Sequence, residues 1–324
     1  MARKTILVAL GGNAIKKADE KGSAEEQFAS VYVTAKELVK LLKAGHRLVI
    51  THGNGPQVGN LLLQFEACKE VPPQPLDIAG AMTQGQIGYM FMQAMQNLLW
   101  EERLTLPVVA IVNQVLVSED DPDYQDPTKP VGPFYTKEEA ERLKIERPDW
   151  VIKEVKPQNV ERRFRRVVPS PDPLRNLEYI AIRRMVDAGI IIIASGGGGI
   201  PVVYDKQTGQ LKGTAAVIDK DLAGERLAEV VGADVLLILT DVPYAMINFG
   251  KPDQKPVETI AYSEMMKLYE EGHFKAGSMG PKVKAALRFI DFGGERAIIT
   301  SLDKAFEAIR HGYGTQILPD WKKF

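Results

Sequence analysis

The sequence predicts an α/β fold built around a mainly parallel sheet, and three observations support this prediction. The run Thr5–Leu10 is apolar and ends at glycine, which is typical of a strand buried on both faces. A helical pattern and a second strand over 47–51 follow with short connections, as in the βαβ unit of a parallel sheet. A third apolar run, over 190–195, also stops at glycines.

The turns that end these three strands, which we call the glycine elbows, are the first candidate for a binding site. In open α/β sheets, ligands bind beyond the carboxyl ends of the strands, and glycine lets backbone N–H groups approach an anion without a Cβ in the way. We therefore expect the elbows to share one crevice. They consist of Gly11, Gly12 and Asn13; His52, Gly53, Asn54 and Gly55; and Gly196, Gly197, Gly198 and Gly199.

The first third of the chain is expected to alternate strands with two long helices. Ser23 and Glu26 can form a capping box and Gly45 a stop, which predicts a helix between them. The methionines of the second helix are expected to fill the core. The expected order is a strand over 5–10, a helix over 23–44, a strand over 47–51, a helix over 77–100, and a strand over 108–112 that continues towards Val117.

The region 118–172 differs from the rest because it is rich in proline and charge and has weak periodicity. Structureless loops of this length are uncommon in compact domains, which favours a small projecting subdomain over a disordered insertion. Small strands are expected at 150–152 and 164–168. Its cluster of Arg162, Arg163, Arg165 and Arg166 is explained more simply as a solvated face than as an anion site.

Alternating strands and helices return after residue 176. Pro281 at the first position of a helix and Gly293 past its end mark one helix of this region. The expected order is a helix over 177–188, a strand over 190–195, a hairpin over 202–209, a helix over 221–231, a strand over 235–240, a helix over 281–292, a strand over 297–300, a helix over 303–310 and a strand over 315–318.

Composition narrows the class of protein. The 324 residues carry a formal net charge of -1, which gives no electrostatic reason to expect a nucleic acid or a membrane as partner. Cys68 is the one cysteine, which excludes an internal disulfide and a cysteine-rich zinc site, and the four histidines lack metal-ligand spacing, so no protein-held metal is expected. No apolar run approaches the ~18 residues that span a bilayer. A cytoplasmic enzyme acting on small molecules is expected.

Two nucleotide-binding motifs are absent or weak. The chain contains no Gly-x-x-x-x-Gly-Lys-Ser/Thr pattern, which excludes a P-loop. The glycine run over 53–59 is one residue too long for the dinucleotide fingerprint, and Asp77, in the place of the ribose-binding acid, follows a proline-rich loop.

What remains are glycine-rich anion sites and lysines, a combination that suits phosphoryl transfer to an acceptor that is already anionic. Lys129 lies between prolines, and Lys220 lies between Asp219 and Asp221 at a helix N-terminus, where the dipole also favours phosphate. Lys282 follows a glycine-rich turn at another helix start. For each lysine, a solvated surface side chain remains the alternative.

Two further side chains keep both a functional and a structural interpretation. His52 could be a ligand, although a hydrogen-bonded structural histidine is the simpler interpretation. Asp241, after the strand over 235–240, could contact a metal or nucleotide, or could act only as a cap.

These motifs resemble those of the carbamate kinases of the amino-acid-kinase fold, in the same order along nearly the whole chain. The matching stretches are Ala9–Ala14, Thr51–Gly59, Pro127–Phe134, Val168–Pro173, Ala194–Gly199, Ile218–Ala223 and Gly272–Lys282. The resemblance implies a three-layer α/β/α sandwich around a mainly parallel sheet, and a homodimer. It also implies an N-terminal lobe over 1–190 for the carbamoyl group, with a protruding subdomain over 118–172, and a C-terminal lobe over 191–324 for the nucleotide.

The resemblance also implies roles for individual residues. Catalysis would involve Lys129, Lys220, Asp221 and Lys282. Carbamate and the transferred phosphoryl group would be bound by Gly11, Gly12, Asn13, Gly53, Asn54 and Gly55. The nucleotide would contact Gly196, Gly197, Asp241, Tyr244, Met279 and Gly280. Mg²⁺ would arrive with ATP or ADP and be held largely by phosphates and water.

The implied reaction is the reversible conversion of ATP and carbamate into ADP and carbamoyl phosphate, without a covalent enzyme intermediate. A sister kinase of the same fold, acting on N-acetylglutamate, glutamate or UMP, is the first alternative, but such kinases lack the Pro127–Phe134 segment. A non-catalytic sensor is the second, but it should have lost Lys220 or Lys282. The residues alone leave open whether the reaction makes ATP in arginine breakdown by the arginine deiminase pathway or supplies carbamoyl phosphate.

Overall fold

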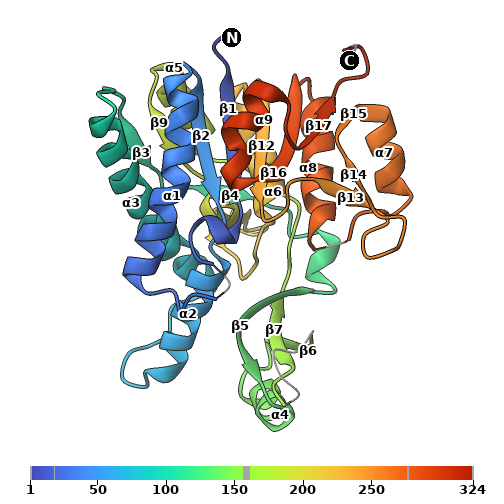
Figure 1. Ribbon diagram of the computed structural model, residues 1–324. Coiled ribbons are helices and arrows are strands. Elements are labelled where there is room, and N and C mark those ends of the chain that lie inside the picture. The colour runs from blue at the N-terminus through green and yellow to red at the C-terminus, as the bar shows by residue number, and fades with distance from the viewer. Residues whose placement is uncertain (1, 18, 156–160, 276, 323–324) are drawn as a thin grey trace.

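The computed structural model describes residues 2–17, 19–155, 161–275 and 277–322. The described residues form a central eight-stranded sheet with the order β15-β17-β16-β12-β1-β2-β9-β3 (Figure 1). Six of these strands are parallel, and β17 runs antiparallel to β16 while β15 runs parallel to β17. The strands are β1 (Thr5–Leu10), β2 (Arg47–His52), β3 (Val108–Ala110), β9 (Ile191–Ile193), β12 (Val235–Thr240), β15 (Thr259–Ala261), β16 (Arg296–Ser301) and β17 (Thr315–Leu318).

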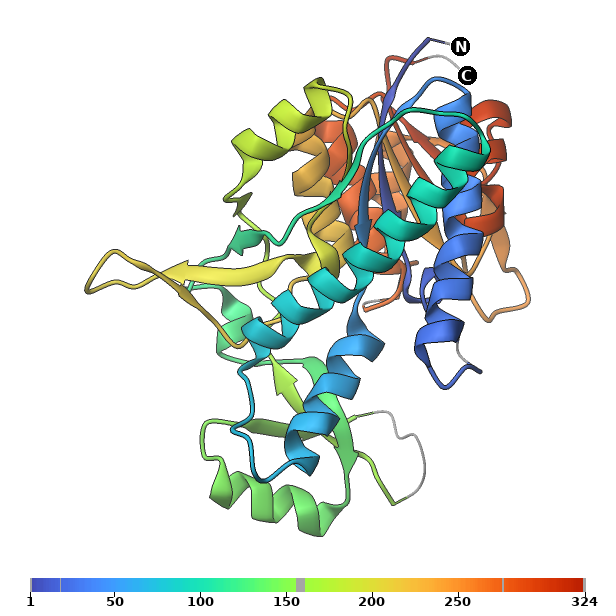
Figure 2. The ribbon, with the colours of Figure 1, turned by 90° about the vertical axis from the view of Figure 1, so that its left-hand side faces the viewer.

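Helices cover both faces of this sheet, so the predicted three-layer sandwich is confirmed (Figure 2). One face carries α1 (Ala24–Lys43), α3 (Leu76–Glu101) and α9 (Ala305–His311). The other face carries α5 (Tyr179–Asp187), α6 (Lys220–Val231), α7 (Tyr262–Glu270) and α8 (Met279–Asp291). The capping box of Ser23 and Glu26 opens α1 as predicted.

Strand β1 lies at the centre of the core and is buried along its whole length. Ile6, Val8 and Leu10 pack into the layer of α1 and α3, whereas Leu7 and Ala9 pack into the layer of α6 and α8. Because both faces of the strand are covered, all of its side chains can be apolar. This explains the unbroken apolar run in the sequence.

The prediction of a single strand over 108–112 that continues towards Val117 is wrong. This segment is divided into β3, at the edge of the large sheet, and β4 (Gln114–Leu116), in a second sheet of order β11-β10-β4-β8. Asn113 lies at the break and turns its side chain to buried hydrogen-bond partners. The other members are β8 (Arg175–Asn176), β10 (Ile200–Tyr204) and β11 (Leu211–Gly213), and β10 and β11 form the predicted hairpin.

The described residues between 129 and 168 form a small unit that projects from the main body (Figure 1). Its three-stranded sheet has the order β5-β7-β6, and Tyr135, Ala140 and Ile152 form a small core of their own. Strand β5 contains Pro130 and Pro133, so its sequence does not show the pattern of a strand. It can accommodate both prolines because it lies at the edge of its sheet. The elements over 118–172 are η2 (Pro122–Tyr124), β5 (Lys129–Tyr135), α4 (Lys137–Glu146), β6 (Val151–Glu154) and β7 (Phe164–Val168).

Several other elements differ from the sequence-based expectations. Helix α8 begins at Met279, so Pro281 is its third residue and not its first. Met82 on α3 is 44% exposed and does not fill the core, unlike Met90 and Met95. The expected helix over 303–310 is η4 (Leu302–Lys304) followed by α9. Outside the projecting unit, the elements not expected from the sequence include α2 (Gly55–Ala67), β8, β13 (Ala245–Ile247), β14 (Lys255–Val257), β15, α7, η1 (Gly12–Ala14) and η3 (Gly196–Gly198).

Strand β9 has an unexpected place relative to the proposed lobes. It pairs with β2 and β3, and therefore lies in the half of the sheet formed by the first 110 residues, although the expected boundary between the lobes lies before β9.

In the part of the chain that the structure describes, no helix has the length and apolar character needed to cross a membrane.

Candidate active site

The three glycine elbows come together at the carboxyl edge of the large sheet. A Cβ added at Gly53 would lie 3.4 Å from Cδ of Lys220 and 3.9 Å from the backbone nitrogen of Gly12. Gly197 has a φ of +67°, and a Cβ there would lie 2.2 Å from Nδ2 of Asn54. Glycine is therefore required at 197 for both backbone conformation and space. Asn54 and Gly55 of the second elbow and Gly197 and Gly199 of the third line one cleft, whereas Asn13 of the first elbow lines a different hollow, so the shared crevice is only partly as expected.

A buried polar network holds the third elbow in place. Ser195 has a φ of +54°, and its backbone N–H donates to Oδ1 of Asn113 over 2.6 Å. Its hydroxyl donates to Oδ1 of Asn176 over 2.7 Å, and Thr51 donates its hydroxyl to the carbonyl of Ser195 over 2.9 Å. Asn113 and Asn176 were not among the predicted site residues, since two asparagines 63 positions apart give no local signal of a shared role.

Two of the predicted lysines bind the same buried carboxylate. Nζ of Lys220 donates to Oδ1 of Asp221 over 2.5 Å, and Nζ of Lys282 donates to Oδ2 over 2.8 Å. Burial, with 2% of Asp221 exposed, opposes its ionisation, but the two lysines outweigh it and lower the pKa of Asp221 to about 2. The carboxylate is therefore charged throughout the physiological range. It holds two cations side by side at the N-termini of α6 and α8.

The charge on Lys220 depends on this arrangement. Burial lowers the pKa of Lys220, and Asp221 partly restores it. Repulsion from Lys282 acts in the same direction as burial. The ammonium group of Lys220 therefore depends on Asp221 for its charge, and in this largely buried place it would interact strongly with an incoming phosphate.

The third predicted lysine reaches the same helix from the projecting subdomain. Nζ of Lys129 lies 3.4 Å from Oδ2 of Asp219, whose Oδ1 accepts the backbone N–H of Asp221 over 2.9 Å and caps α6. Asp219 therefore links the subdomain to the start of the helix that carries Lys220. In the sequence, Asp219 stands out only as a neighbour of Lys220.

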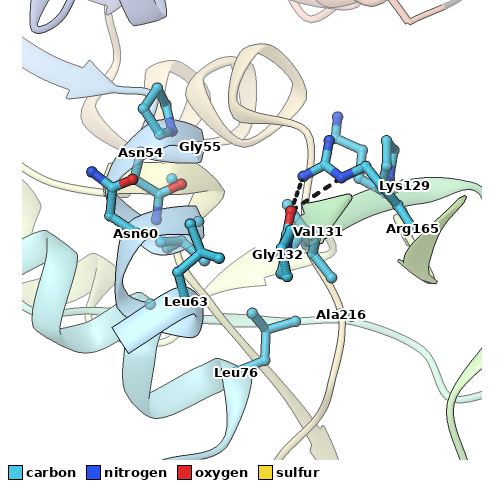
Figure 3. A pocket seen from close by; sticks show the side chains of 18 of the residues that line it. Asn54, Gly55, Asn60, Leu63, Leu76, Lys129, Val131, Gly132, Arg165 and Ala216 are labelled. Carbon is cyan, nitrogen blue, oxygen red and sulfur yellow. Dashed lines mark hydrogen bonds between the residues drawn. The ribbon is translucent and has the colours of Figure 1, made fainter. Parts of the chain in front are cut away.

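A cleft of about 620 Å³ separates α2 from the subdomain (Figure 3). Asn54, Asn60 and Leu63 line it from α2 and the elbow before it, and Lys129 and Arg165 line it from the other side. A cleft of this size admits a small anion and the water around it.

The arginine cluster is more than the solvated face that the sequence favoured. Arg165 is half-buried, lies 4.8 Å from the ring centroid of Phe134, and donates to the carbonyl of Gly132 over 3.1 Å from Nε and 2.6 Å from a terminal nitrogen. Arg162 also borders the cleft, whereas Arg166 packs over the ring of Trp150. A sequence cannot show which of four adjacent arginines turn towards a cleft.

His52 fits the structural interpretation. It is buried, its Nδ1 lies 2.9 Å from the carbonyl of Gly53, and its ring stacks on Phe91 with centroids 6.2 Å apart. Burial lowers the pKa of His52 to about 4, so the imidazole is neutral near pH 7. The hydrogen bond to the carbonyl places its proton on Nδ1.

The remaining predicted residues lie around this centre or beside it. The N–H of Gly11 is bonded to β12, and Gly280 donates its N–H to the carbonyl of Lys275 over 2.9 Å at the start of α8. Asn13 and Asp241 line a different hollow, of about 340 Å³. Tyr244 packs against Tyr313, with ring centroids 5.3 Å apart. Among the described residues, no group of three or more histidine, cysteine, aspartate or glutamate side chains is placed to hold a metal.

The fold and this centre of lysines and glycine turns define a small-molecule phosphotransferase, and comparison with known proteins identifies its family. A model of the amino acid kinase family matches residues 4–301. The carbamate kinase of Pyrococcus furiosus is 51% identical over 319 residues, covering 98% of this chain and 99% of that protein. The carbamate kinase of Thermococcus kodakarensis is 52% identical, covering 97% and 99%.

A solved structure agrees with these sequence relatives. The carbamate kinase of Giardia lamblia bound to AMP-PNP superposes with a TM-score of 0.92 at 45% identity, covering 98% of this chain and 99% of that one. The chain therefore belongs to the amino acid kinase family and, within it, to the carbamate kinases. The resemblance found in the sequence is confirmed.

Proposed function

We propose that the chain catalyses the reversible transfer of the terminal phosphoryl group of ATP to carbamate, which gives ADP and carbamoyl phosphate. The observation that carries this proposal is the buried centre in which Lys220 and Lys282 share Asp221. Carbamate is already an anion, so the acceptor needs no general base, and the transfer is direct, without a covalent enzyme intermediate. Catalysis consists of positioning the two anions and stabilising the charge that develops between them.

The elbows provide the acceptor site in this proposal. Gly11, Gly12, Asn13, Gly53, Asn54 and Gly55 surround carbamate and the phosphoryl group. The N–H groups of Gly11 and Gly53 already donate to the carbonyls of Leu239 and Leu10, so Gly12 provides the backbone N–H donor among Gly11, Gly12 and Gly53. Carbamate has few atoms, so selectivity requires a close fit of backbone to ligand. Gly53, where a Cβ would touch Lys220, and Gly197, where a Cβ would overlap Asn54, allow such a close approach.

The lysines act on the transferred group. Lys220 and Lys282 lie at helix N-termini and spread positive charge over its oxygens, and Asp221 keeps both side chains in place. Lys129 approaches from the subdomain and exchanges its contact with Asp219 for the substrate. Because Lys129 comes from a separate unit of the fold, it can complete the site after the substrate has entered.

The nucleotide occupies the C-terminal lobe, over residues 191–324, and the carbamoyl group occupies the N-terminal lobe, over 1–190. The nucleotide contacts are proposed at Gly196, Gly197, Asp241, Tyr244, Met279 and Gly280. The binding of AMP-PNP by the Giardia lamblia relative supports an ATP site. In this arrangement one set of residues serves both directions of the reaction, including ATP formation in arginine breakdown. A cytoplasmic location agrees with the use of ATP and ADP as substrates.

The donors of the site are compatible with Mg²⁺ that arrives with the nucleotide. Both oxygens of Asp221 are engaged by lysines, and those of Asp219 are engaged by Lys129 and by the N–H of Asp221. The ion would therefore be held by phosphate oxygens and water, and it would offset charge on the phosphates. The lysines would neutralise the charge that remains.

Formation of ATP by the purified protein from ADP, Mg²⁺ and carbamoyl phosphate tests the proposal, with acetyl phosphate as a parallel donor. We expect ATP from carbamoyl phosphate at a rate that exceeds the rate from acetyl phosphate. An inactive protein that instead transfers phosphate from ATP to N-acetylglutamate, glutamate or UMP would assign the chain to a sister kinase. Binding of ATP without any transfer would favour a sensor.

We also propose that the chain forms a homodimer through α3. Ile78, Met82 and Tyr89 follow one face of this helix and are 42%, 44% and 53% exposed. A row of exposed apolar side chains on one helix is typical of an interface. Light scattering of wild type should give twice the chain mass, and Tyr89→Asp should reduce it to one chain, whereas Tyr204→Asp, at an exposed tyrosine elsewhere, should not.

A further inference from the structure

The chain that returns from the projecting subdomain is fixed to α8 by charge. Asp172, the last residue of the subdomain segment, accepts hydrogen bonds on both carboxylate oxygens from the guanidinium group of Arg288, with Nη1 to Oδ1 at 2.6 Å. Lys284, one turn earlier on the same helix, lies 3.4 Å from Oδ2. Two-pronged pairing of this kind fixes orientation as well as distance.

Burial strengthens this contact. The side chains of Arg288 and Asp172 are 28% and 34% exposed. Burial opposes the charge on Asp172, but Arg288 and Lys284 outweigh it and lower the pKa of Asp172. Asp172 in turn raises the pKa of Arg288. The pair is therefore fully charged near pH 7.

Further bonds join this returning segment to the outgoing one and to α6. The carboxylates of Asp121 and Asp123 accept the backbone N–H groups of Asp172 over 2.9 Å and Ser170 over 3.1 Å. Nε of Arg226, on α6, donates to the carbonyl of Pro173 over 3.2 Å. The two chain segments that connect the subdomain to the main body are thus held together and against α6 and α8 (Figure 1).

Each end of this linkage carries a lysine of the proposed site. Lys129 on β5 pairs with Val168 on β7, and Val168 lies four residues before Asp172 in the sequence. Lys282 lies six residues before Arg288 on α8, in the same unbroken helix. A short, hydrogen-bonded path therefore connects the lysine of the subdomain to one of the two lysines on Asp221.

We propose that Asp172 and Arg288 are a positioning pair that sets the place of Lys129 relative to Lys282, an inference that rests on the proposed phosphoryl transfer. With this pair formed, the base of the subdomain moves as one body with α6 and α8, and closure of the cleft takes place against α2. Without it, Lys129 would still be present but would reach the transferred group less often.

The test is the kinetics of Asp172→Asn, Arg288→Gln and the double variant, each with ADP and carbamoyl phosphate varied in turn. We expect turnover to fall about fivefold to tenfold in each single variant and no further in the double, because the bidentate contact between Asp172 and Arg288 is lost in all three. The KM for ADP should stay within twofold. Asp172→Glu, which keeps the charge, should recover most of the turnover.

A double-mutant cycle with Lys129 distinguishes a positioning role of Asp172 from a general loss of structure. In a Lys129→Ala background, Asp172→Asn should have no further effect on turnover, because the pair acts through Lys129. Equal losses with and without Lys129 would overturn the proposal. If Asp172→Asn fails to fold, the same cycle with Arg288→Gln decides the question.

Glu295→Gln is the matched control. It breaks the contact between Lys4 and Glu295, whose side chains are 30% and 41% exposed, at the opposite edge of the sheet. It should lower the melting temperature to a similar extent and leave turnover unchanged. A wild type that is inactive with carbamoyl phosphate would contradict the proposed function, whereas an active wild type with unaffected Asp172→Asn would contradict only the positioning pair.

Discussion

Lys282 donates a hydrogen bond of 2.8 Å to Asp221, a residue on a different helix. The contact joins the N-termini of α6 and α8, and Lys220 binds the other oxygen of the same carboxylate. Two lysines this close would repel each other in the buried site without the charge between them. The carboxylate is therefore what makes a pair of phosphate-binding cations possible.

Asp221→Asn should lower turnover by about 10²–10³-fold, since both lysines lose their common partner. It should also move the alkaline limb of the pH–rate profile to lower pH. Asp221 now raises the pKa of Lys220 against burial, so its removal lets that pKa fall further and Lys220 loses its charge earlier as pH rises. Asp187→Asn, at an exposed carboxylate of α5, is the control. An unchanged alkaline limb would show that Lys220 does not carry the charge that matters.

Lys129→Ala should lower turnover at least tenfold, or about 1.4 kcal/mol of barrier, and leave nucleotide binding nearly intact. The reason is its position on the subdomain, across the cleft from α2 (Figure 3). Steady-state kinetics with titration of ADP would measure both quantities. Lys137→Ala, at an exposed lysine of α4, should change neither. Equal losses of turnover and of ADP affinity would contradict a role on the carbamoyl side.

The strands and helices of the sandwich could be predicted because their signals are local. The apolar run of β1, the capping box at Ser23 and the glycine after α1 each require only neighbours in the sequence. The elements that were missed depend on contacts with distant residues. β5 contains two prolines and is a strand because β7 pairs with it, and α2 begins at a glycine that also ends an elbow.

The candidate site divides in the same way. The elbows and lysines could be proposed from glycine turns and helix starts, and the structure brings Gly53, Gly197 and Lys220 together. The groups that hold these residues in place could not be predicted. Asn113, Asn176 and Asp172 bind partners that lie more than 60 residues away in the sequence. A polar side chain in a loop reveals its partner only once the chain is folded.

His52 should limit stability in acid. Its pKa is about 4 in the folded protein, below the ordinary 6.5, so the unfolded chain takes up the proton first as pH falls. The contribution of neutral His52 to the free energy of unfolding is complete above pH 6.5 and is lost as pH falls towards 4. Melting temperatures from pH 7 to pH 4 should therefore drop less steeply in His52→Gln than in wild type. His311→Gln, at an exposed histidine, should follow the wild-type curve.

Glu225 should have the opposite pH dependence. It is fully buried on α6, and neither carboxylate oxygen has a hydrogen-bond partner among the described residues. Burial raises the pKa of Glu225 well above its ordinary value, and the neighbouring Glu229 adds to the effect. The unfolded chain therefore loses this proton at lower pH than the folded protein does, so stability falls as pH rises above about 4.3.

Glu225→Gln removes the proton and keeps the shape of the side chain. The melting temperature of this variant minus that of wild type should increase steadily between pH 5 and pH 9, because only wild type carries the Glu225 carboxyl group whose deprotonation lowers stability across that range. Calorimetry at fixed ionic strength would measure the difference, with Glu141→Gln on the exposed face of α4 as the control for a lost carboxylate. A difference that stays constant with pH would mean that Glu225 is ionised in the folded protein, with Arg226 or Arg288 as the group that compensates its charge.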